Sequence, residues 1–319
     1  MVTHGDSAQA QPAGEFGQFA AGSPGRVRPG SGGTTSGAPV AAASDLVSRR
    51  GVAGRCYRPY HAEVGINRMR RYWPAALAAV VALSCPAIYG VYLAPEYALA
   101  DPFDHFDLAM SNLLPLLFPL LPTLIYGPIF AAELSGGYWM PAQAREGRRA
   151  YVRRHVSRAA TTAGLLYVTV VLAWGAFTMR IAPALNLINY QTQTAFPVPR
   201  DRFTWSQLVA FGEPAFFVGY GLWVGLHAAL YGALSVLLLI HISNHFLALA
   251  APALAVFLIN FVLGNLDLGN WGLLPAVFTG NLMQGPLWIP LINTLPLIGL
   301  CTWLYIRARN PGERVVAFQ

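Results

Sequence analysis

Between Glu213 and Asp267 the sequence reads PAFFVGYGLWVGLHAALYGALSVLLLIHISNHFLALAAPALAVFLINFVLGNL, without one charged side chain. A helix that crosses about 30 Å of hydrocarbon needs roughly 20 apolar residues, because each residue advances the helix by about 1.5 Å. The stretch is therefore long enough for two crossings. Its middle, HISNH at 241–245, is polar, and this predicts a tight turn that joins two membrane-spanning helices.

The sequence has four further stretches with almost no charged side chains, at 72–95, 106–132, 159–179 and 268–306. The last of these is too long for one helix. Residues 264–286 are rich in Gly and Asn, which predicts a re-entrant loop or a short helical hairpin that dips into the membrane before the final helix. The predicted fold is an all-α integral membrane protein with six transmembrane helices, at roughly 73–94, 111–132, 159–180, 217–240, 245–264 and 287–306.

The composition excludes several classes of protein. Hydrophobic residues make up 55% of the chain and charged residues only 11%, against roughly 25% charged residues in a soluble domain. The chain contains no lysine, because all 21 basic residues are arginine. A Walker A loop, a Schiff base with pyridoxal or retinal, and a Ser/Lys catalytic dyad are therefore excluded. The three cysteines are too scattered to form a disulfide framework or a metal site.

Three regions are expected along the chain. Residues 1–67 are dominated by Gly, Ala, Ser and Pro and show no hydrophobic period, so we expect a disordered cytoplasmic tail. Residues 68–310 form the six-helix domain, and residues 311–319 form a second cytoplasmic tail. The N-terminus lacks the apolar core of a signal peptide. Translation from Met1 and translation from Met69 both remain open.

The arginines predict the orientation. Nine precede the first span, six lie between the second and third spans, and three follow the last, whereas only Arg180, Arg200 and Arg202 fall on the other side. By the positive-inside rule both termini are cytoplasmic, in a multi-pass protein of the cell (inner or plasma) membrane. This distribution explains the net charge of +7 without a nucleic-acid partner.

The loop between the second and third spans carries the most information. It reads AELSGGYWMPAQAREGRRAYVRRH from Ala132 to His155. An acidic residue stands where the second span leaves the membrane, glycines permit a sharp turn, and a basic stretch leads into the third span. We expect a short element in the membrane interface whose arginines are available to lipid phosphate or to an acidic partner surface. The alternative is that these arginines only set the topology.

This loop resembles that of the membrane (permease) subunits of type-2 ABC transporters, and the resemblance covers about residues 70–310. In that family the segment touches a separate ATPase subunit. Arg153 or Arg154 takes the place of a lysine often found at the start of the third span. The residues that match the coupling pattern are Glu133, Gly136, Arg145, Arg148 and Arg149.

The resemblance implies a chain that is not itself an enzyme. ATP and Mg would be bound by a partner ABC ATPase subunit, and this chain would need no cofactor of its own. A second permease subunit, in a homodimer or a heterodimer, and membrane lipid would be the other partners. Export is the usual direction of transport in the family, and the sequence does not select a substrate.

Several membrane-embedded residues are candidates for lining a pathway. Pro115 and Pro119, with two further prolines in the same span, predict either a broken helix that lines a pathway or ordinary kinks. His227 is the one imidazole deep in a span; it either binds substrate or, as we favour, forms a hydrogen bond to another helix. No span has an acid at its middle, which argues against a proton-driven carrier.

Other polar groups support weaker hypotheses. His241 and His245 have helical spacing but lack the glutamate of a metalloprotease motif, and we expect no metal there. The acids of the external loop at 101–107 lack the spacing of a calcium loop. Two alternatives to a permease stay open: a membrane enzyme that acts on lipids through His227 or these acids, and a membrane scaffold that does not transport.

Overall fold

The computed structural model describes residues 60–190, 204–278 and 285–310. These residues belong to one compact unit, Pro59–Gln319. Every regular element in the described ranges is a helix. The all-α prediction is therefore confirmed for this part of the chain.

Six helical segments are long and apolar enough to cross a membrane, as the sequence predicted: Tyr72–Glu96, Pro102–Ser135, Arg148–Ala184, Glu213–His241, His245–Asn265 and Trp288–Arg309. The first segment comprises most of α1 (Tyr60–Ala87) with a π-helix, η1 (Ile88–Leu93), and a 3-10 turn, η2 (Ala94–Glu96). The third comprises α6 (Arg148–Ala176), η3 (Phe177–Ile181) and α7 (Ala182–Ala184). The last three are α8 (Glu213–His241), α9 (His245–Asn265) and α11 (Trp288–Arg309).

The second segment is broken into three helices, α2 (Pro102–Ser111), α3 (Leu113–Leu117) and α4 (Leu121–Ser135). The first break is at Asn112, whose backbone leaves the helical region. Pro119 lies in the second break, and Pro122 follows at the start of α4. Because proline has no backbone N–H and its ring clashes with the preceding turn, the helical ladder is interrupted here. The sequence predicted one span at 111–132; the structure begins it earlier and divides it.

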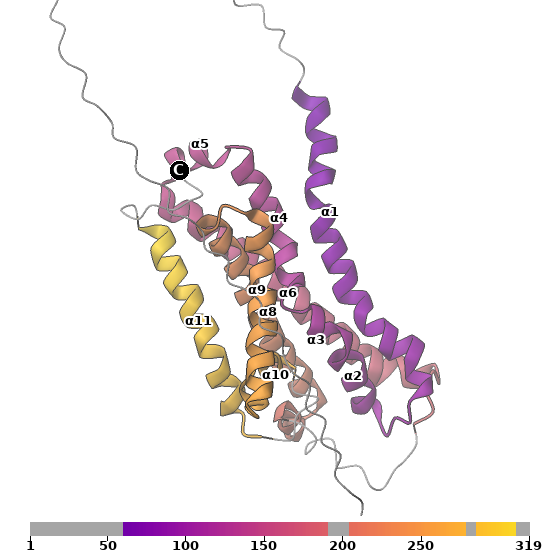
Figure 1. Ribbon diagram of the computed structural model, residues 1–319. Helices are drawn as coiled ribbons and strands as arrows, with labels where there is room; N and C mark the ends of the chain where they lie inside the picture. Colours follow the sequence, from indigo (N-terminus) through magenta and orange to yellow (C-terminus); the bar gives the residue numbers. More distant parts are fainter. Residues whose placement is uncertain (1–59, 191–203, 279–284, 311–319) are drawn as a thin grey trace, which may run out of the picture. The chain divides into compact units, whose positions relative to one another are not determined.

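Helix α8 lies at the centre of the bundle. It packs most extensively against α6, and α4, α9, α11 and the 3-10 helix η5 (Thr204–Phe211) surround its other faces. Figure 1 shows α1 and α11 on opposite sides of it. The close approach of α6 depends on Gly232, because a Cβ atom at this position would lie 2.7 Å from the carbonyl oxygen of Ala159.

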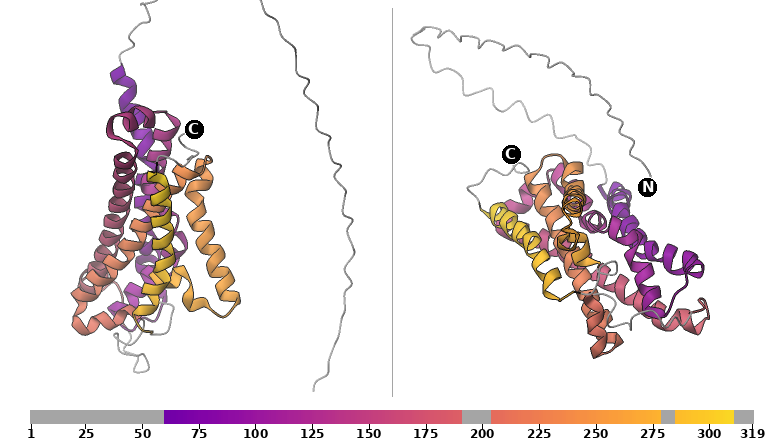
Figure 2. Two further views of the ribbon diagram at one scale, coloured as in Figure 1. Left: turned by 90° about the vertical axis from the view of Figure 1, so that its left-hand side faces the viewer. Right: turned by 60° about the horizontal axis from the view of Figure 1, so that its bottom comes forward.

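Two connections follow α8 along the chain. The predicted turn at 241–245 is present: α8 ends at His241, and the Asn244 side chain caps α9 by accepting from the Leu247 N–H at 3.1 Å. Between α9 and α11 lie η6 (Gly269–Trp271) and α10 (Leu273–Val277). Helix α10 contacts α8, α9 and α11, and Figure 2 shows this part of the bundle from two further directions.

The helices extend beyond the apolar runs from which they were predicted. Helix α6 begins at Arg148, ahead of the predicted 159, because a charged side chain ends an apolar run without ending a helix. Helix α1 begins at Tyr60, so the last residues of the predicted tail 1–67 are helical. The remainder of that tail and the predicted tail 311–319 lie outside the described residues.

Candidate functional site

The segment between the second and third spans forms a short helix of its own. Helix α4 ends at Ser135 with Gly136 as its C-cap, and α5 (Trp139–Glu146) follows. Gly147 then separates α5 from α6 with φ 78°. A left-handed backbone conformation of this kind favours glycine, so the sequence Glu-Gly-Arg sets the boundary between the two helices.

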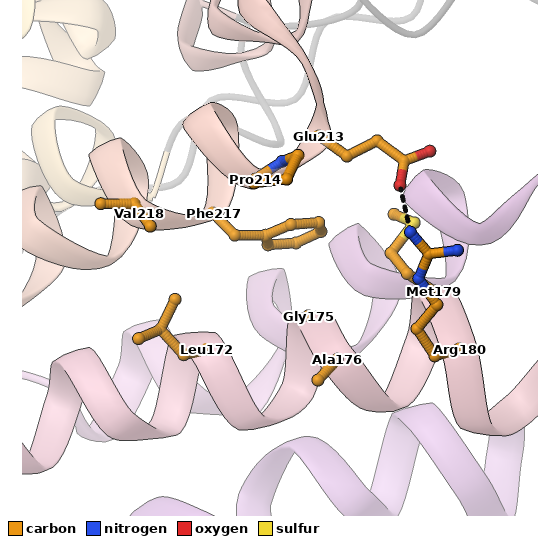
Figure 3. A pocket seen from close by; sticks show the side chains of 9 residues that line it. All are labelled: Leu172, Gly175, Ala176, Met179, Arg180, Glu213, Pro214, Phe217 and Val218. Atoms are coloured by element: carbon orange, nitrogen blue, oxygen red, sulfur yellow. Dashed lines mark ion pairs between the residues drawn. The ribbon is translucent and has the colours of Figure 1, made fainter.

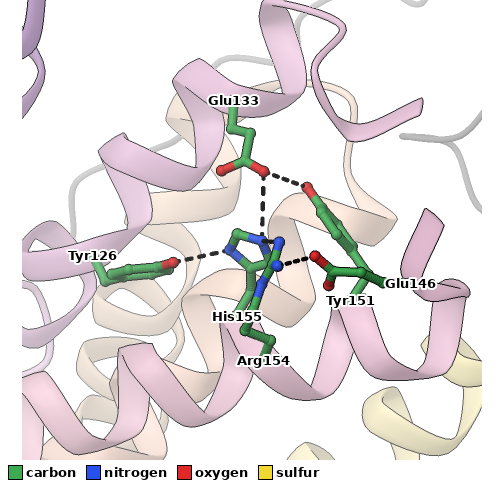
Figure 4. Close-up of polar contacts among 6 residues, drawn as sticks. All are labelled: Tyr126, Glu133, Glu146, Tyr151, Arg154 and His155. Carbon is green, nitrogen blue, oxygen red and sulfur yellow. Dashed lines mark hydrogen bonds and ion pairs between the residues drawn. The ribbon is translucent and has the colours of Figure 1, made fainter. Parts of the chain in front are cut away.

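Six side chains from α4, α5 and α6 meet beside this turn, and Figure 4 shows them. We call them the polar cluster; they are Tyr126, Glu133, Glu146, Tyr151, Arg154 and His155.

The contacts of the polar cluster join all three helices. The Tyr151 hydroxyl donates to Glu133 Oε1 at 3.1 Å, and this links α6 to α4. The Tyr126 hydroxyl lies 2.9 Å from His155 Nδ1, which makes a second link between the same helices. An ion pair between Arg154 and Glu146 connects α6 to α5.

The two nitrogens of His155 have different partners. Arg154 Nη2 lies 3.3 Å from Nε2, and arginine can only donate. The tautomer with hydrogen on Nδ1 satisfies both contacts, because Nδ1–H then donates to the Tyr126 oxygen while Nε2 accepts from Arg154. Glu133 Oε1 is 3.5 Å from the same Nε2 and accepts from Tyr151 instead.

Aromatic rings enclose the inner part of the polar cluster, whereas Arg154 and Glu146 are partly exposed. Tyr151 and His155 are buried, with ring centroids 4.4 Å apart. Phe130 of α4 covers His155 at 4.8 Å. Hydrogen bonds between buried polar groups hold their helices in one arrangement. The end of α4 and the beginning of α6 therefore move together.

The last span is connected to the same region. Arg148, the first residue of α6, donates from Nε to the Ala308 carbonyl oxygen of α11 at 2.7 Å. The outer surface of α5 is different, because Met140 and Arg145 are exposed there, as is Arg149 at the start of α6. The region thus combines an inner face bonded to three spans with an accessible outer face.

The predicted coupling residues separate into two groups. Glu133, Gly136 and Arg148 hold the helices of this region in place, whereas Arg145 and Arg149 lie on the exposed surface. Sequence reasoning did not assign roles to four members of the cluster: Tyr126, Glu146, Tyr151 and His155. The four-residue spacing of the last two, which places them on one face of a helix, is a signal that was present in the sequence.

His227 forms the hydrogen bond to another helix that the sequence favoured. Its Nε2 lies 2.9 Å from Thr294 Oγ1 of α11, and its Nδ1 lies 3.0 Å from the Trp223 carbonyl oxygen one turn earlier in α8. The side chain is buried. Pro119 is also buried, and Pro115 is half-buried. Their role in lining a pathway stays a prediction.

Two acids of the segment 101–107 cap a helix. Asp101 Oδ1 accepts from the Asp104 N–H at 3.0 Å, and Asp104 Oδ2 accepts from the Ala100 N–H at 3.0 Å, so both carboxylates serve the start of α2. His241 Nδ1 contacts the Leu237 carbonyl oxygen of its own helix, and His245 Nδ1 contacts Ser135 Oγ. Among the described residues no group of three or more His, Cys, Asp or Glu is arranged to hold a metal ion.

Comparison of the chain with family models, curated proteins and solved structures finds no match.

Proposed function

We propose that this chain is the membrane-spanning permease subunit of an ATP-binding cassette transporter, energised by a separate ATPase subunit that docks on α5. The observation that carries the proposal is α5 itself: a short helix outside the spans, with Arg145 exposed on it, Arg149 exposed just after it at the start of α6, and an ion pair from Glu146 to Arg154 of α6. An ATPase that moved α5 would move α4 and α6 through the polar cluster.

The contacts of the region support this transmission. The Arg154–Glu146 ion pair passes a displacement from α5 to α6, and the Tyr151–Glu133 hydrogen bond passes it to α4. The Arg148 contact with Ala308 extends it to α11. Since packed helices shift between discrete arrangements more readily than they deform, such a displacement repositions three spans at once.

The charge distribution supports an orientation with α5 in the cytoplasm. Among the described residues from Tyr72 onward, seven arginines outside α5 lie at the same end of the bundle as α5, at 148, 149, 153, 154, 158, 307 and 309. The opposite end carries Arg180 and several acids. We therefore infer cytoplasmic termini in the cell membrane, with a disordered N-terminal tail as its composition indicates.

The segment between α9 and α11 suits a re-entrant element at the external side. The Trp223 indole donates to the Ala276 carbonyl oxygen at 2.8 Å, and Asn293 Nδ2 donates to the Asn270 carbonyl oxygen at 3.0 Å. These bonds satisfy backbone carbonyls that lipid would leave unpaired. We propose that a second permease subunit completes the pathway and that transport is outward.

The test is affinity purification of the tagged full-length chain from its own membranes in mild detergent, with identification of bound proteins and an ATPase assay. The unaltered chain should retain an ABC ATPase. The double variant Arg145→Glu, Arg149→Glu should lose about tenfold or more of that binding, because reversed charges at an interface repel the partner. Both side chains are exposed, so the fold should be unaffected.

The matched control is Arg307→Glu, which reverses an exposed charge at the same end of the molecule on α11. It should retain the ATPase. Arg148 is left unaltered because its side chain bonds to Ala308. Recovery of the chain without any ATPase, or equal loss of the ATPase in the double variant and the control, would contradict docking on α5.

A further inference from the structure

A narrow apolar groove lies between α6 and α8 at the end of the bundle opposite α5, and Figure 3 shows its lining. Its volume is about 250 Å³. Whole drug-sized ligands occupy pockets of roughly 300–1,000 Å³, so this groove has room for a single chain of a larger molecule. The lining residues are Leu172, Gly175, Ala176, Met179, Arg180, Glu213, Pro214, Phe217 and Val218.

The wall of the groove is fixed by packing. A Cβ atom on Gly175 would lie 2.4 Å from the Phe217 ring, so glycine allows this ring to rest directly against α6. The Phe217 ring also packs against two further aromatic rings: it stacks on Phe103 at 6.0 Å and meets Phe106 edge-on at 5.0 Å. The groove is therefore formed by a rigid surface before anything binds.

One end of the groove is charged. Arg180 Nη2 and Glu213 Oε2 face each other across it at 3.7 Å, with 79% and 47% of their side chains exposed. This separation is longer than a charge-assisted hydrogen bond of about 2.7–2.9 Å. Arg180 lies near the end of the third span and Glu213 begins the fourth. The charged pair thus lies at a membrane interface, and the apolar groove runs from it toward the membrane interior.

The dimensions match the part of an acyl chain nearest the head group. From Arg180 to Leu172 the groove follows eight residues of helix, or about 12 Å at about 1.5 Å per residue. Leu172 and Val218 are exposed along its open side, where the lipid of a bilayer surrounds the bundle. A molecule with a charged head and an apolar tail fits this arrangement in one direction only.

We propose that the groove is a binding site for a zwitterionic aminophospholipid of the surrounding bilayer. Its phosphate accepts from the Arg180 guanidinium, its primary ammonium donates to the Glu213 carboxylate, and the first part of one acyl chain occupies the groove. A net-neutral pair of protein charges is complementary to a head group that carries both signs. The site is separate from α5 and does not depend on the proposed ATPase.

The charges also predict selectivity among lipids. A phosphatidylglycerol head group would gain the Arg180 contact but would be repelled by Glu213. A phosphatidylcholine head group carries both signs, but its quaternary ammonium has no N–H to donate to the carboxylate. Phosphatidylethanolamine satisfies both residues, so it should bind about tenfold more tightly than either, the effect of one well-formed charge-assisted hydrogen bond.

The test is native mass spectrometry of the purified full-length chain titrated with dioleoyl phosphatidylethanolamine, phosphatidylcholine or phosphatidylglycerol. Ala176→Leu places a larger side chain in the groove and should weaken phosphatidylethanolamine binding about tenfold or more. The matched control is Ala173→Leu, an exposed position on the same helix outside the groove, which should bind as the unaltered chain does.

A second variant tests the head group. Glu213→Gln removes the partner of the ammonium and should make phosphatidylethanolamine and phosphatidylcholine bind equally, while Glu96→Gln, an exposed acid at the same end, should preserve the preference. Because Glu213 is exposed, this test stands even if Ala176→Leu folds poorly. Equal binding of all three lipids to the unaltered chain would overturn the proposal. The proposal would also be overturned if the unaltered chain forms a dimer and the Ala176→Leu chain loses that dimer but binds lipid normally. The groove would then be the contact surface for a second copy of the chain.

Discussion

Helices α8 and α9 are consecutive spans joined by a turn of three residues, yet they occupy opposite environments. In the most apolar stretch of α8, 78% of the residues are buried, whereas in the most apolar stretch of α9 only 22% are buried. Helix α9 is nevertheless the more apolar of the two. Lipid tails are as apolar as a protein interior, so hydrophobicity does not draw a helix to the centre of a membrane bundle. Packing and hydrogen bonding decide the position instead.

The side chains of α8 explain its central place. Gly232 lets the backbone of α6 approach closely, and His227 and Trp223 form hydrogen bonds to α11 and to the carbonyl of Ala276 at the end of α10. In α9, by contrast, a Cβ atom added to Gly264 would meet nothing within 4 Å. Contacts between membrane helices are expected to depend on small residues and on hydrogen bonds between polar groups.

The largest contrast is expected from truncating leucines. Leu237 of α8 is 1% exposed and Leu258 of α9 is 64% exposed. Leu237→Ala should lower the free energy of unfolding by about 2–5 kcal/mol, because it leaves a cavity among packed helices. Leu258→Ala should change it by less than about 0.5 kcal/mol. Unfolding in sodium dodecyl sulfate, followed by circular dichroism, measures both, and similar losses would remove the distinction between the helices.

A smaller effect is expected from adding one methyl group. Gly232→Ala brings a Cβ atom to 2.7 Å from a backbone oxygen of α6, and the helices must separate, at a cost of about 1–3 kcal/mol. Gly264→Ala meets open space and should stabilise α9 by up to about 1 kcal/mol through its helix propensity. Thermal unfolding in detergent gives the sign of each change. A stabilised Gly232→Ala variant would show that the close approach does not hold α8 in place.

The smallest effect is expected from one hydroxyl. Thr294→Val keeps the shape of the side chain but removes the oxygen that lies 2.9 Å from His227 Nε2. Interhelical hydrogen bonds in membranes contribute about 0.6 kcal/mol on average, and a loss of that order is expected. The control Thr302→Val alters an exposed position on the same helix and should be neutral. If the two variants unfold alike, the bond between α8 and α11 contributes nothing to stability.

The number and approximate position of the spans were predictable from the sequence, because charged residues rarely lie inside hydrocarbon. The central position of α8 was not, since the more apolar α9 lies outside it. The break at Pro119 was foreseen only as one of two alternatives. A proline removes one backbone hydrogen bond in any context, but whether the helix bends or breaks depends on the neighbouring helices.

The candidate site was predictable in part. Glu133 could be selected because it stands at the edge of an apolar run, and Arg148 because it matches the coupling pattern of the family that the loop resembles. Their partners, Tyr151 and Ala308, come from other helices, and the register of one helix against another is not encoded in local spacing. The opposite roles of Arg148, which holds α11, and Arg149, which is exposed, are likewise consequences of helix rotation.

The central place of α8 also orders the assembly of the chain during translation. Chains are made from the N-terminus, and early segments can pack before later ones exist. Helix α8 packs against α4 and α6, which precede it, and against α9 and α11, which follow it. On insertion it therefore completes one half of the bundle and provides the surface for the other. The contact between Arg148 and Ala308 can form only after α11 has been made, so it joins the start of the third span to a helix that is inserted later.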